Sequence, residues 1–258
     1  MQLTSTNSSI GLIYALKKIF IMKSTIIQKK TEPFVDLKLP KNRLSKIVYN
    51  QTYRQNYKRS FFQSAFDFLY ANNIEGDYFE FGVHKARTFR FALYESYVRD
   101  LKMNFYAFDS FEGLPNVQNN EIQNKSFKTK LLKTNVNQFR NLVKPYLLKR
   151  NLEIIKGYYS KSLNNKLTKE FKQKKIKASM INIDCDLNES VRESLNFALN
   201  FVQNGTVLYI DDYYLTFKGH PSKGNPKIVR DLLKKFKLIY EPWHVCGSSG
   251  KSFLLYKK

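Results

Sequence analysis

The feature that most constrains the fold is a regular alternation of short apolar runs with longer stretches of helical spacing. Each apolar run has the length of a strand, and each stretch between them carries apolar residues on one helical face. We expect strands over 77–83, 104–109, 152–155, 178–184 and 205–211. The helices that follow them are expected over 86–100, 136–148, 162–174, 188–203 and 225–236. A helix over 53–72 is expected before this series, and strands over 238–243 and 252–257 after it.

This order predicts an α/β fold with a Rossmann-like, doubly wound and mostly parallel sheet. The last two strands are separated by a short segment with Gly247 and Gly250, so we expect an antiparallel C-terminal hairpin at one edge. We divide the chain into a basic N-terminal extension, residues 1–50, and a folded domain, residues 51–258. A hydrophobic fraction of 43% is enough to give that domain a packed core.

The net charge of the chain is +23, from 44 Lys and Arg against 21 Asp and Glu. A basic balance favours an acidic partner such as nucleic acid or a membrane surface. Lys, Asn, Ile, Tyr and Phe are all abundant, however, and this is the profile of an AT-rich coding sequence. Composition therefore explains the charge better than a nucleic-acid function does.

The chain has two cysteines, Cys185 and Cys246, and neither belongs to a CxxC pair. A zinc site or a disulfide framework is not indicated, and a reducing, cytoplasmic location fits. Residues 10–22 are apolar but contain two lysines, and they are shorter than the roughly 20 apolar residues of a membrane span. They form either an amphipathic helix for peripheral contact with a membrane or a partner, or the stretch before a true start at Met22.

Acidic residues or glycines follow each of the five expected parallel strands. Ligands of open α/β sheets bind beyond the carboxyl ends of the strands, so these residues are expected to share one site. The candidates are Glu80, Phe81, Gly82 and Val83 at the end of the first strand, Asp109 and Ser110 at the end of the second, Gly157 after the third, Asp184 and Asp186 at the end of the fourth, and Asp211 and Asp212 at the end of the fifth.

The first three strand ends suit a nucleoside cofactor. Gly82 allows close approach of the backbone, Asp109 can accept two ribose hydroxyls, Glu80 can hold a charged group through water, and Gly157 can turn around an adenine. The alternatives are a turn cap at Asp109, a buried ion pair at Glu80 and an ordinary loop at Gly157. Neither GxGxxG nor GxxxxGK[ST] is present, which argues against dinucleotides and nucleoside triphosphates. S-adenosylmethionine, which has no pyrophosphate, fits this pattern.

The last two strand ends suit a hard cation. Asp184, Asp211 and Asp212 would converge across neighbouring strands, and three carboxylates favour Mg²⁺ over Zn²⁺. Their mutual repulsion would be relieved by the ion. The alternative is that Asp186 and Asp212 cap the helices that follow them.

Five segments together resemble the macrocin O-methyltransferase (TylF/MycF-like) family of class I methyltransferases: GDYFEFGV (76–83), FDSFEGLP (108–115), GYYSKSL (157–163), IDCDLNESVRESL (183–195) and NGTVLYIDDYY (204–214). The resemblance implies S-adenosylmethionine, a divalent metal and a hydroxyl acceptor, often on a sugar. It places metal ligation on Asp184, Asp211 and Asp212, and cofactor binding on Glu80, Gly82, Asp109, Ser110 and Gly157. The sequence departs from the family at residues 84–88 (HKART), where a small Gly-rich turn is usual and where Arg87 would either crowd the methionine end of the cofactor or point outward.

These observations predict an O-methyltransferase that acts on a sugar, a glycosylated small molecule or a surface glycan. Mg²⁺ on Asp184, Asp211 and Asp212 would hold the acceptor hydroxyl. Asp186 would be the base, with His244 as the second candidate for that role. We expect Asp211→Ala to abolish turnover and to leave cofactor binding largely intact. The alternatives are a nucleic-acid methyltransferase and a non-catalytic binding module with a degenerate cofactor pocket. A homo-oligomer is also compatible with the sequence.

Overall fold

The computed structural model describes residues 41–115, 132–215 and 217–258. The chain divides into two compact units, residues 1–49 and residues 50–258, and the description below concerns the second unit. The segment 10–22, for which we predict a membrane or partner contact, lies outside the described residues. No described helix is long and apolar enough to cross a membrane.

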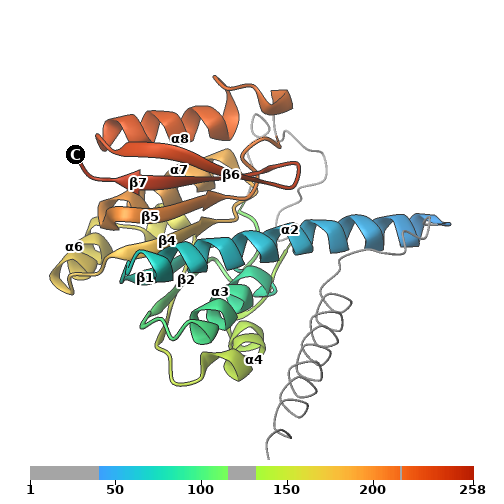
Figure 1. Ribbon diagram of the computed structural model, residues 1–258, viewed down its shortest axis with the longest axis horizontal. Helices are drawn as coiled ribbons and strands as arrows, with labels where there is room; N and C mark the ends of the chain where they lie inside the picture. Colours follow the sequence, from blue (N-terminus) through green and yellow to red (C-terminus); the bar gives the residue numbers. More distant parts are fainter. Residues whose placement is uncertain (1–40, 116–131, 216) are drawn as a thin grey trace, which may run out of the picture. The chain divides into compact units, whose positions relative to one another are not determined.

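The centre of the domain is a seven-stranded sheet in the order β3-β2-β1-β4-β5-β7-β6 (Figure 1). The strands are β1 (Asp77–Phe81), β2 (Phe105–Asp109), β3 (Leu152–Lys156), β4 (Ala178–Ile183), β5 (Val202–Ile210), β6 (Ile239–Cys246) and β7 (Gly250–Tyr256). The first five run parallel, and β7 lies antiparallel between β5 and β6. The predicted Rossmann-like fold with a C-terminal hairpin is confirmed.

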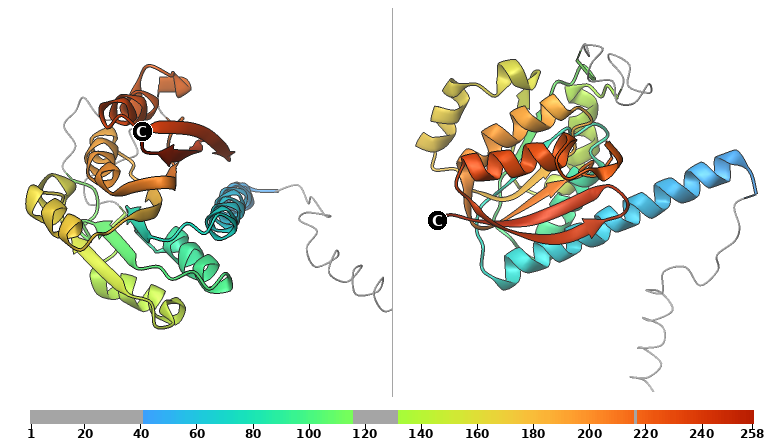
Figure 2. Two further views of the ribbon diagram at one scale, coloured as in Figure 1. Left: turned by 60° about the vertical axis from the view of Figure 1, so that its left-hand side comes forward. Right: turned by 90° about the horizontal axis from the view of Figure 1, so that it is seen from above.

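Helices cover both faces of the sheet, and for that reason the central strands β1 and β4 are buried along their whole length (Figure 2). One face packs against α2 (Arg43–Ala71), α3 (Arg87–Val98) and α4 (Val136–Leu147). The other packs against α6 (Asn165–Gln173), α7 (Asn188–Ala198) and α8 (Gly224–Lys235). Successive strand residues serve opposite faces, so Tyr78 belongs to the core under α2 and Phe79 to the core under α6 and α7.

Two helices differ from the prediction, one by a break and one by an earlier end, and at each of these points an asparagine side chain caps the backbone. The helix predicted over 162–174 is two helices, α5 (Tyr159–Ser162) and α6, because the Asn164 side chain accepts a hydrogen bond from the Leu167 amide and starts a new helix. The helix predicted over 188–203 ends at Ala198, and a 3-10 turn over Leu199–Phe201 leads into β5. The Asn200 side chain satisfies two carbonyls of this helix end.

Backbone hydrogen bonds between neighbouring parallel strands continue for one residue past the carboxyl end of each strand. The amide of Gly82 donates to Phe108 O at 2.9 Å, and the amide of Asp184 donates to Phe81 O at 2.9 Å. The amide of Asp211 donates to the carbonyl at the end of β4 at 3.0 Å in the same way. These bonds hold the loops after the strands in a fixed register, so their first side chains meet at one edge of the sheet.

Candidate active site

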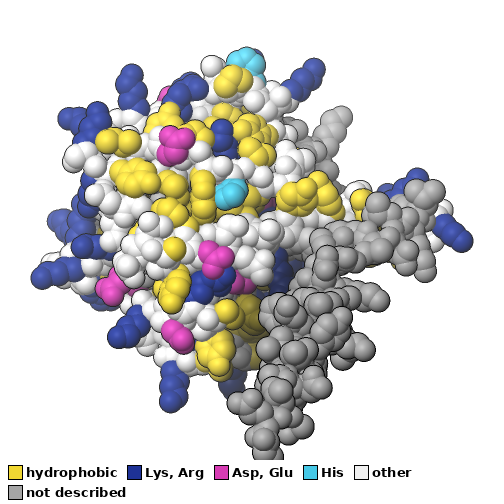
Figure 3. All heavy atoms as spheres, in the orientation of Figure 1, with side chains coloured by type: hydrophobic (Ala, Val, Ile, Leu, Met, Phe, Trp, Pro, Cys, Tyr) yellow, Lys and Arg dark blue, Asp and Glu magenta, His cyan; other side chains and the backbone are white. Residues whose placement is uncertain are grey.

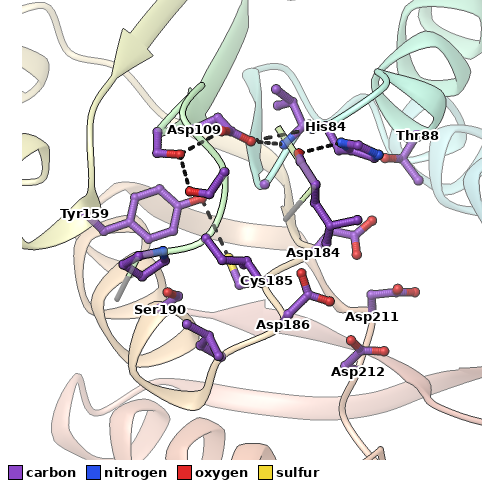
Figure 4. Close-up of a pocket in the computed structure, with 18 of the residues that line it drawn as sticks. His84, Thr88, Asp109, Tyr159, Asp184, Cys185, Asp186, Ser190, Asp211 and Asp212 are labelled. Carbon is purple, nitrogen blue, oxygen red and sulfur yellow. Dashed lines mark hydrogen bonds between the residues drawn. The ribbon is translucent and has the colours of Figure 1, made fainter. Parts of the chain in front are cut away.

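A cavity of about 590 Å³ opens at this edge, and most of the predicted site residues line it (Figure 4). The loops after all five parallel strands contribute to it, together with residues of α2 and the start of α7. The predicted residues in its wall are Gly82, Val83, Asp109, Ser110, Gly157, Asp184, Asp186, Asp211 and Asp212. The sequence-based expectation that these strand ends share one site agrees with this arrangement.

Glu80 and Phe81 do not belong to the cavity wall. The Glu80 carboxylate is fully buried and accepts hydrogen bonds from the Tyr78 hydroxyl and from Thr88 Oγ1, the latter at 2.7 Å. Burial raises the pKa of Glu80 to about 7, although both hydrogen bonds oppose that shift. Phe81 stacks on Phe108 with ring centroids 4.3 Å apart. Both residues support the loop after β1 from beneath, and direct cofactor contact by either stays a prediction.

The Asp109 carboxylate connects the loop after β1 with the loop after β2. Its Oδ2 accepts from the Val83 amide at 2.9 Å, and its Oδ1 accepts from the Phe111 amide at 2.7 Å. The turn-capping role considered for Asp109 is therefore present, and the residue also faces the cavity. The carboxylate also accepts from the His84 amide and from Ser110 Oγ, both at the long distance of 3.5 Å. A ligand hydroxyl would therefore have to replace one of these long bonds, while the two short ones stay in place.

Gly82 and Gly157 both have backbone angles that favour glycine, with φ of +86° and +141°. A Cβ on Gly82 would lie 2.2 Å from the backbone oxygen of Asp184, so no other residue fits without a shift of the β4 loop. Gly157 is less confined, since its nearest neighbour would be the Ser162 side chain at 3.2 Å.

The loop 84–88, where the sequence departs from the family pattern, adopts backbone angles typical of glycine although its residues are larger. His84 and Ala86 have φ of +32° and +55°, the left-handed region that glycine normally occupies. Thr88 points down to Glu80, whereas Arg87 is exposed and lines the cavity. His84 Nδ1 lies 2.7 Å from Leu132 O, which fixes the start of the loop.

The part of the cavity lined by Asp184, Asp186, Asp211 and Asp212, here called the acidic side, contains a buried lysine that the sequence analysis did not single out. Lys58 Nζ, on α2, donates to Asp211 Oδ2 at 2.7 Å and to Asp184 Oδ2 at 3.2 Å. Burial lowers the pKa of Lys58, but the charges of Asp184 and Asp211 outweigh it and hold that pKa above its usual range. The ammonium group is therefore a permanent positive charge between the two carboxylates.

The four aspartates of this side surround one space in the close-up (Figure 4), and their surroundings differ. Burial raises the pKa of Asp211, but Lys58 outweighs that effect, so Asp211 has a lowered pKa; Tyr209 also donates to its Oδ1 at 2.8 Å. Burial and the charge of Asp211 raise the pKa of Asp212 to about 7 and that of Asp186 to about 6. Asp212 Oδ1 is buried and has no hydrogen-bond partner within the described part of the chain.

Two alternatives from the sequence do not match the observed positions. The helix α7 has Leu187 at its N-cap and no side-chain cap, so Asp186 is not its capping residue. His244, the second candidate base, lies on β6 beside Trp243 with ring centroids 4.2 Å apart, and it does not line the cavity.

A signal for Lys58 was present in the sequence. Lys58, Phe62, Ala65 and Leu69 follow one another at spacings of four, three and four residues, and all are buried on α2. A basic residue in register with the core face of a helix needs an acidic partner. That partner cannot be identified from α2 alone, because Asp211 lies 153 residues further along the chain.

Comparisons with known proteins agree with this geometry. The profile of the macrocin O-methyltransferase (TylF) family matches residues 46–223, more than half of the chain. Among solved structures, the calicheamicin methyltransferase CalS11 has 13% identity and a TM-score of 0.61, with 98% of this chain and 94% of CalS11 covered. The O-methyltransferase NovP has 19% identity and a TM-score of 0.59, with 78% of this chain and 80% of NovP covered. A search of curated proteins finds no significant match.

The sheet order and the cavity at its carboxyl edge are those of the class I methyltransferase fold, and the family match makes S-adenosylmethionine the methyl donor. The chain belongs to the macrocin O-methyltransferase (TylF) family, as its sequence motifs predicted, and it is an O-methyltransferase.

Proposed function

We propose that this enzyme transfers the methyl group of S-adenosylmethionine to a hydroxyl of a sugar, a glycosylated small molecule or a surface glycan. The observation that carries the proposal is the convergence of Asp184, Asp186, Asp211 and Asp212 on the cavity that also contains Gly82 and Asp109. One CalS11 structure is described as a TDP-rhamnose 3'-O-methyltransferase, with 13% identity and a TM-score of 0.54, and this supports a sugar acceptor.

The cofactor is assigned to the side of the cavity formed by the loops after β1, β2 and β3. Asp109 accepts the ribose hydroxyls, Gly82 lets the backbone approach the ligand, and Ser110 and Gly157 complete the pocket. Glu80 acts from beneath, through Thr88 and the loop that Thr88 anchors. When bound, S-adenosylmethionine supplies a methyl group on a positively charged sulfur.

The acceptor is assigned to the acidic side, where alignment of the hydroxyl with the methyl group is the main task. Asp186 takes the hydroxyl proton as the oxygen–methyl bond forms and the sulfur–methyl bond breaks. A carboxyl with a pKa of about 6 is ionised at neutral pH, so Asp186 is ready to accept that proton. The products are a methyl ether, S-adenosylhomocysteine and a protonated carboxyl that loses its proton to solvent.

Mg²⁺ is part of the proposal, with Asp184, Asp211 and Asp212 as its ligands. Three carboxylates are a hard oxygen donor set, and the unpartnered Asp212 Oδ1 is an acceptor that a cation would satisfy. Among the described residues, no group of three or more acidic, His or Cys side chains is arranged to hold a metal ion. When bound, Mg²⁺ lowers the pKa of a coordinated hydroxyl. An ion at these oxygens would require the Lys58 ammonium group to give up its contacts with Asp184 and Asp211.

Two other readings are less well supported. A nucleic-acid methyltransferase would need a continuous basic surface, whereas on the face in Figure 3 the Lys and Arg side chains are spread around the margin. A non-catalytic binding module would need a closed cofactor pocket, whereas this site has a cavity of about 590 Å³ with Arg87 in its wall. We place the reaction in the cytoplasm, as the two unpaired cysteines suggest.

Labelled S-adenosylmethionine and a panel of nucleotide-linked sugars and surface glycans test the proposal. Transfer of the label to one acceptor hydroxyl, located by mass spectrometry, is the expected result. Transfer to RNA alone, with steep dependence on salt, would favour the nucleic-acid alternative. Calorimetry without any heat of cofactor binding would favour the binding module.

A further inference from the structure

Lysines are concentrated in the segment that connects β3 to β4. Residues 161–177 contain seven Lys and a single acidic residue, Glu170, whereas the whole chain has 44 Lys and Arg against 21 Asp and Glu in 258 residues. All seven lysines are exposed, and only Lys174 has an ion pair with a described residue, since it contacts Glu153 and Glu170. The average composition of the chain does not explain this local excess. The other six are here called the lysine strip: Lys161, Lys166, Lys169, Lys172, Lys175 and Lys177.

The outer side of α6 presents three of these lysines in a row. Lys166, Lys169 and Lys172 follow one another at intervals of three residues, which places them about 4.5 Å apart along the helix axis and on one side of it. Leu167 and Phe171 lie on the opposite side and pack into the core. Lys and Arg side chains gather along the left margin of Figure 3, where Figure 1 shows α6. The strip is therefore a narrow row of cations on a helix whose other side is fully used in packing.

The lysine strip begins at the wall of the cavity. Ser160, the residue before Lys161, lines the cavity, and the Ser162 hydroxyl donates to the carbonyl of Gly157 in the same wall at 3.2 Å. The chain then returns to the amino edge of the sheet, where Lys177 directly precedes β4. The strip thus extends from the cavity along α6 to the opposite edge of the sheet.

The side chains of this segment indicate which kind of anion it fits. Residues 157–177 contain no Arg, so the segment lacks the planar group that binds phosphate through two parallel hydrogen bonds. No aromatic or large aliphatic side chain of residues 157–177 is exposed, and the structure describes all of them. Nucleic-acid strands stack on exposed aromatic rings, and membrane-bound helices insert apolar side chains. A linear polymer with spaced carboxylate groups fits a row of lysines better than either.

We propose that the lysine strip binds an anionic glycan chain and that a sugar of this chain enters the cavity to be methylated. The ammonium groups along α6 pair with the acidic groups of the glycan. The acidic side repels those groups, so an uncharged hydroxyl of the chain is what lies there. This inference rests on the glycan acceptor of the proposed function and adds the charge of that glycan. The lysines are positioning residues, since they hold the chain away from the reacting atoms.

Fluorescence anisotropy with the full-length protein and a labelled oligogalacturonate, which has a carboxylate on every sugar, tests the binding. The variant Lys166→Gln/Lys169→Gln/Lys172→Gln removes three charges and keeps residues that favour a helix. It should bind the oligosaccharide at least about tenfold more weakly, with an unchanged melting temperature. Added salt should weaken binding by the unmodified protein more than binding by this variant.

The matched control removes the same charge from the end of α8. Lys234, Lys235 and Lys237 are exposed there, and their replacement by Gln should change the affinity by less than about threefold. Equal losses in the two triple variants would mean that only the net charge matters, and the inference would fall. Absence of oligogalacturonate binding, or equal binding of an uncharged maltooligosaccharide, would also overturn it.

Other polymers decide whether a glycan is the correct partner. Poly(U), polyglutamate or phosphatidylglycerol vesicles, bound more tightly than the oligogalacturonate and lost only in the α6 variant, would assign the strip to another class of partner. Methyl transfer to a short neutral sugar should be the same in the α6 variant and in the unmodified protein. Absence of that transfer and of transfer to every other glycan would count against the proposed function, whatever the strip binds.

Acetylation of the unmodified protein locates the bound chain without any variant. Oligogalacturonate at about ten times its Kd should slow the acetylation of Lys161, Lys166 and Lys169 about tenfold, as measured by mass spectrometry of peptides. Lys234 and Lys237 should react at their normal rates. Equal protection of both groups of lysines would show diffuse attraction and contradict a defined strip.

Discussion

The backbone oxygen of Asp184 lies against the α-carbon of Gly82, so closely that a Cβ on Gly82 would approach it to 2.2 Å. The loop after β1 and the loop after β4 are therefore interlocked at the point where the cofactor side and the acidic side of the cavity meet. The contact is between backbone atoms, which cannot move aside as a side chain could.

Gly82→Ala is expected to damage both sides of the cavity at once. The methyl group would push the Asp184 loop away, and φ of +86° would add backbone strain, so the free energy of unfolding should fall by about 3 kcal/mol or more. Thermal or urea denaturation measures that loss, and calorimetry should show weakened binding of S-adenosylmethionine.

Gly247→Ala is the control for the strain alone. Gly247 also has a left-handed φ, +61°, but a Cβ there would meet nothing within 4 Å. Its cost should be about 1 kcal/mol, without any effect on the cofactor. Equal costs for the two variants would show that the contact with Asp184 is unimportant.

Asp109→Asn tests the assignment of the cofactor side. The amide keeps an oxygen for the Phe111 amide but turns an NH₂ donor toward the Val83 amide and loses the charged acceptor, so S-adenosylmethionine should bind about tenfold to a hundredfold more weakly. Isothermal titration calorimetry measures the affinity. Glu112→Gln, an exposed acid in the same loop, should bind the cofactor normally; an equal loss in both would point to general charge and not to ribose recognition.

Asp211→Asn tests the acidic side with less damage than Asp211→Ala. Alanine would leave Lys58 and the Tyr209 hydroxyl without their acceptor, whereas asparagine keeps the shape of the side chain. Turnover should fall by at least about a hundredfold, with cofactor affinity nearly unchanged, because Asp211 lies on the acceptor side. Single-turnover assays and calorimetry separate the two effects. Near-normal turnover of this variant in chelator would refute the metal role of Asp211.

The pH dependence of stability should identify Glu80 as a buried, weakly ionised acid. Its pKa is raised from 4.5 to about 7, mainly by burial, so the folded state binds the proton more tightly than the unfolded state. Stability due to Glu80 is therefore complete below pH 4.5 and is lost as the pH rises through about 7, by roughly 3 kcal/mol in all.

Glu80→Gln removes this ionisation. Relative to the unmodified protein, the variant should gain stability between pH 5 and pH 8, as urea denaturation at both values would show. Parallel stability profiles for the two proteins would mean that Glu80 does not titrate in this range.

The sequence was sufficient to predict the parallel strands and a shared site at their carboxyl ends, because each of these strands is an apolar run with a glycine or an acid at its end. That position is fixed by the sheet, since strand ends in a parallel sheet lie at one edge. Glu80 illustrates the limit of the argument. It lies within β1, two residues before Gly82, and the alternation of the strand points its side chain into the core under α3. How far the Glu80 side chain lies below the carboxyl edge of the sheet depends on how α3 packs, and the pattern of the strand residues does not predict that packing.

Lys58 shows the second limit. Its helical register predicts burial, but its partners come from β4 and β5, and nothing local to α2 specifies where that helix crosses the sheet edge. The broken helix at Asn164 is a different case. There the signal was local, an asparagine able to cap the next helix, and it competed with an uninterrupted lysine-rich pattern.

Asp186→Asn tests the proposed base. The carboxylate faces the cavity and is not occupied in capping α7, so its loss should affect chemistry more than folding. The rate of the chemical step should fall by about a hundredfold to ten-thousandfold, while the melting temperature and the cofactor affinity stay close to those of the unmodified protein. Rapid-quench measurement of methyl transfer at saturating substrate provides the rate. Glu189→Gln changes a nearby, more exposed acid of the same cavity wall and should retain the normal rate. If both variants react equally fast, the proton leaves the acceptor by another route, and Asp186 only shapes the site.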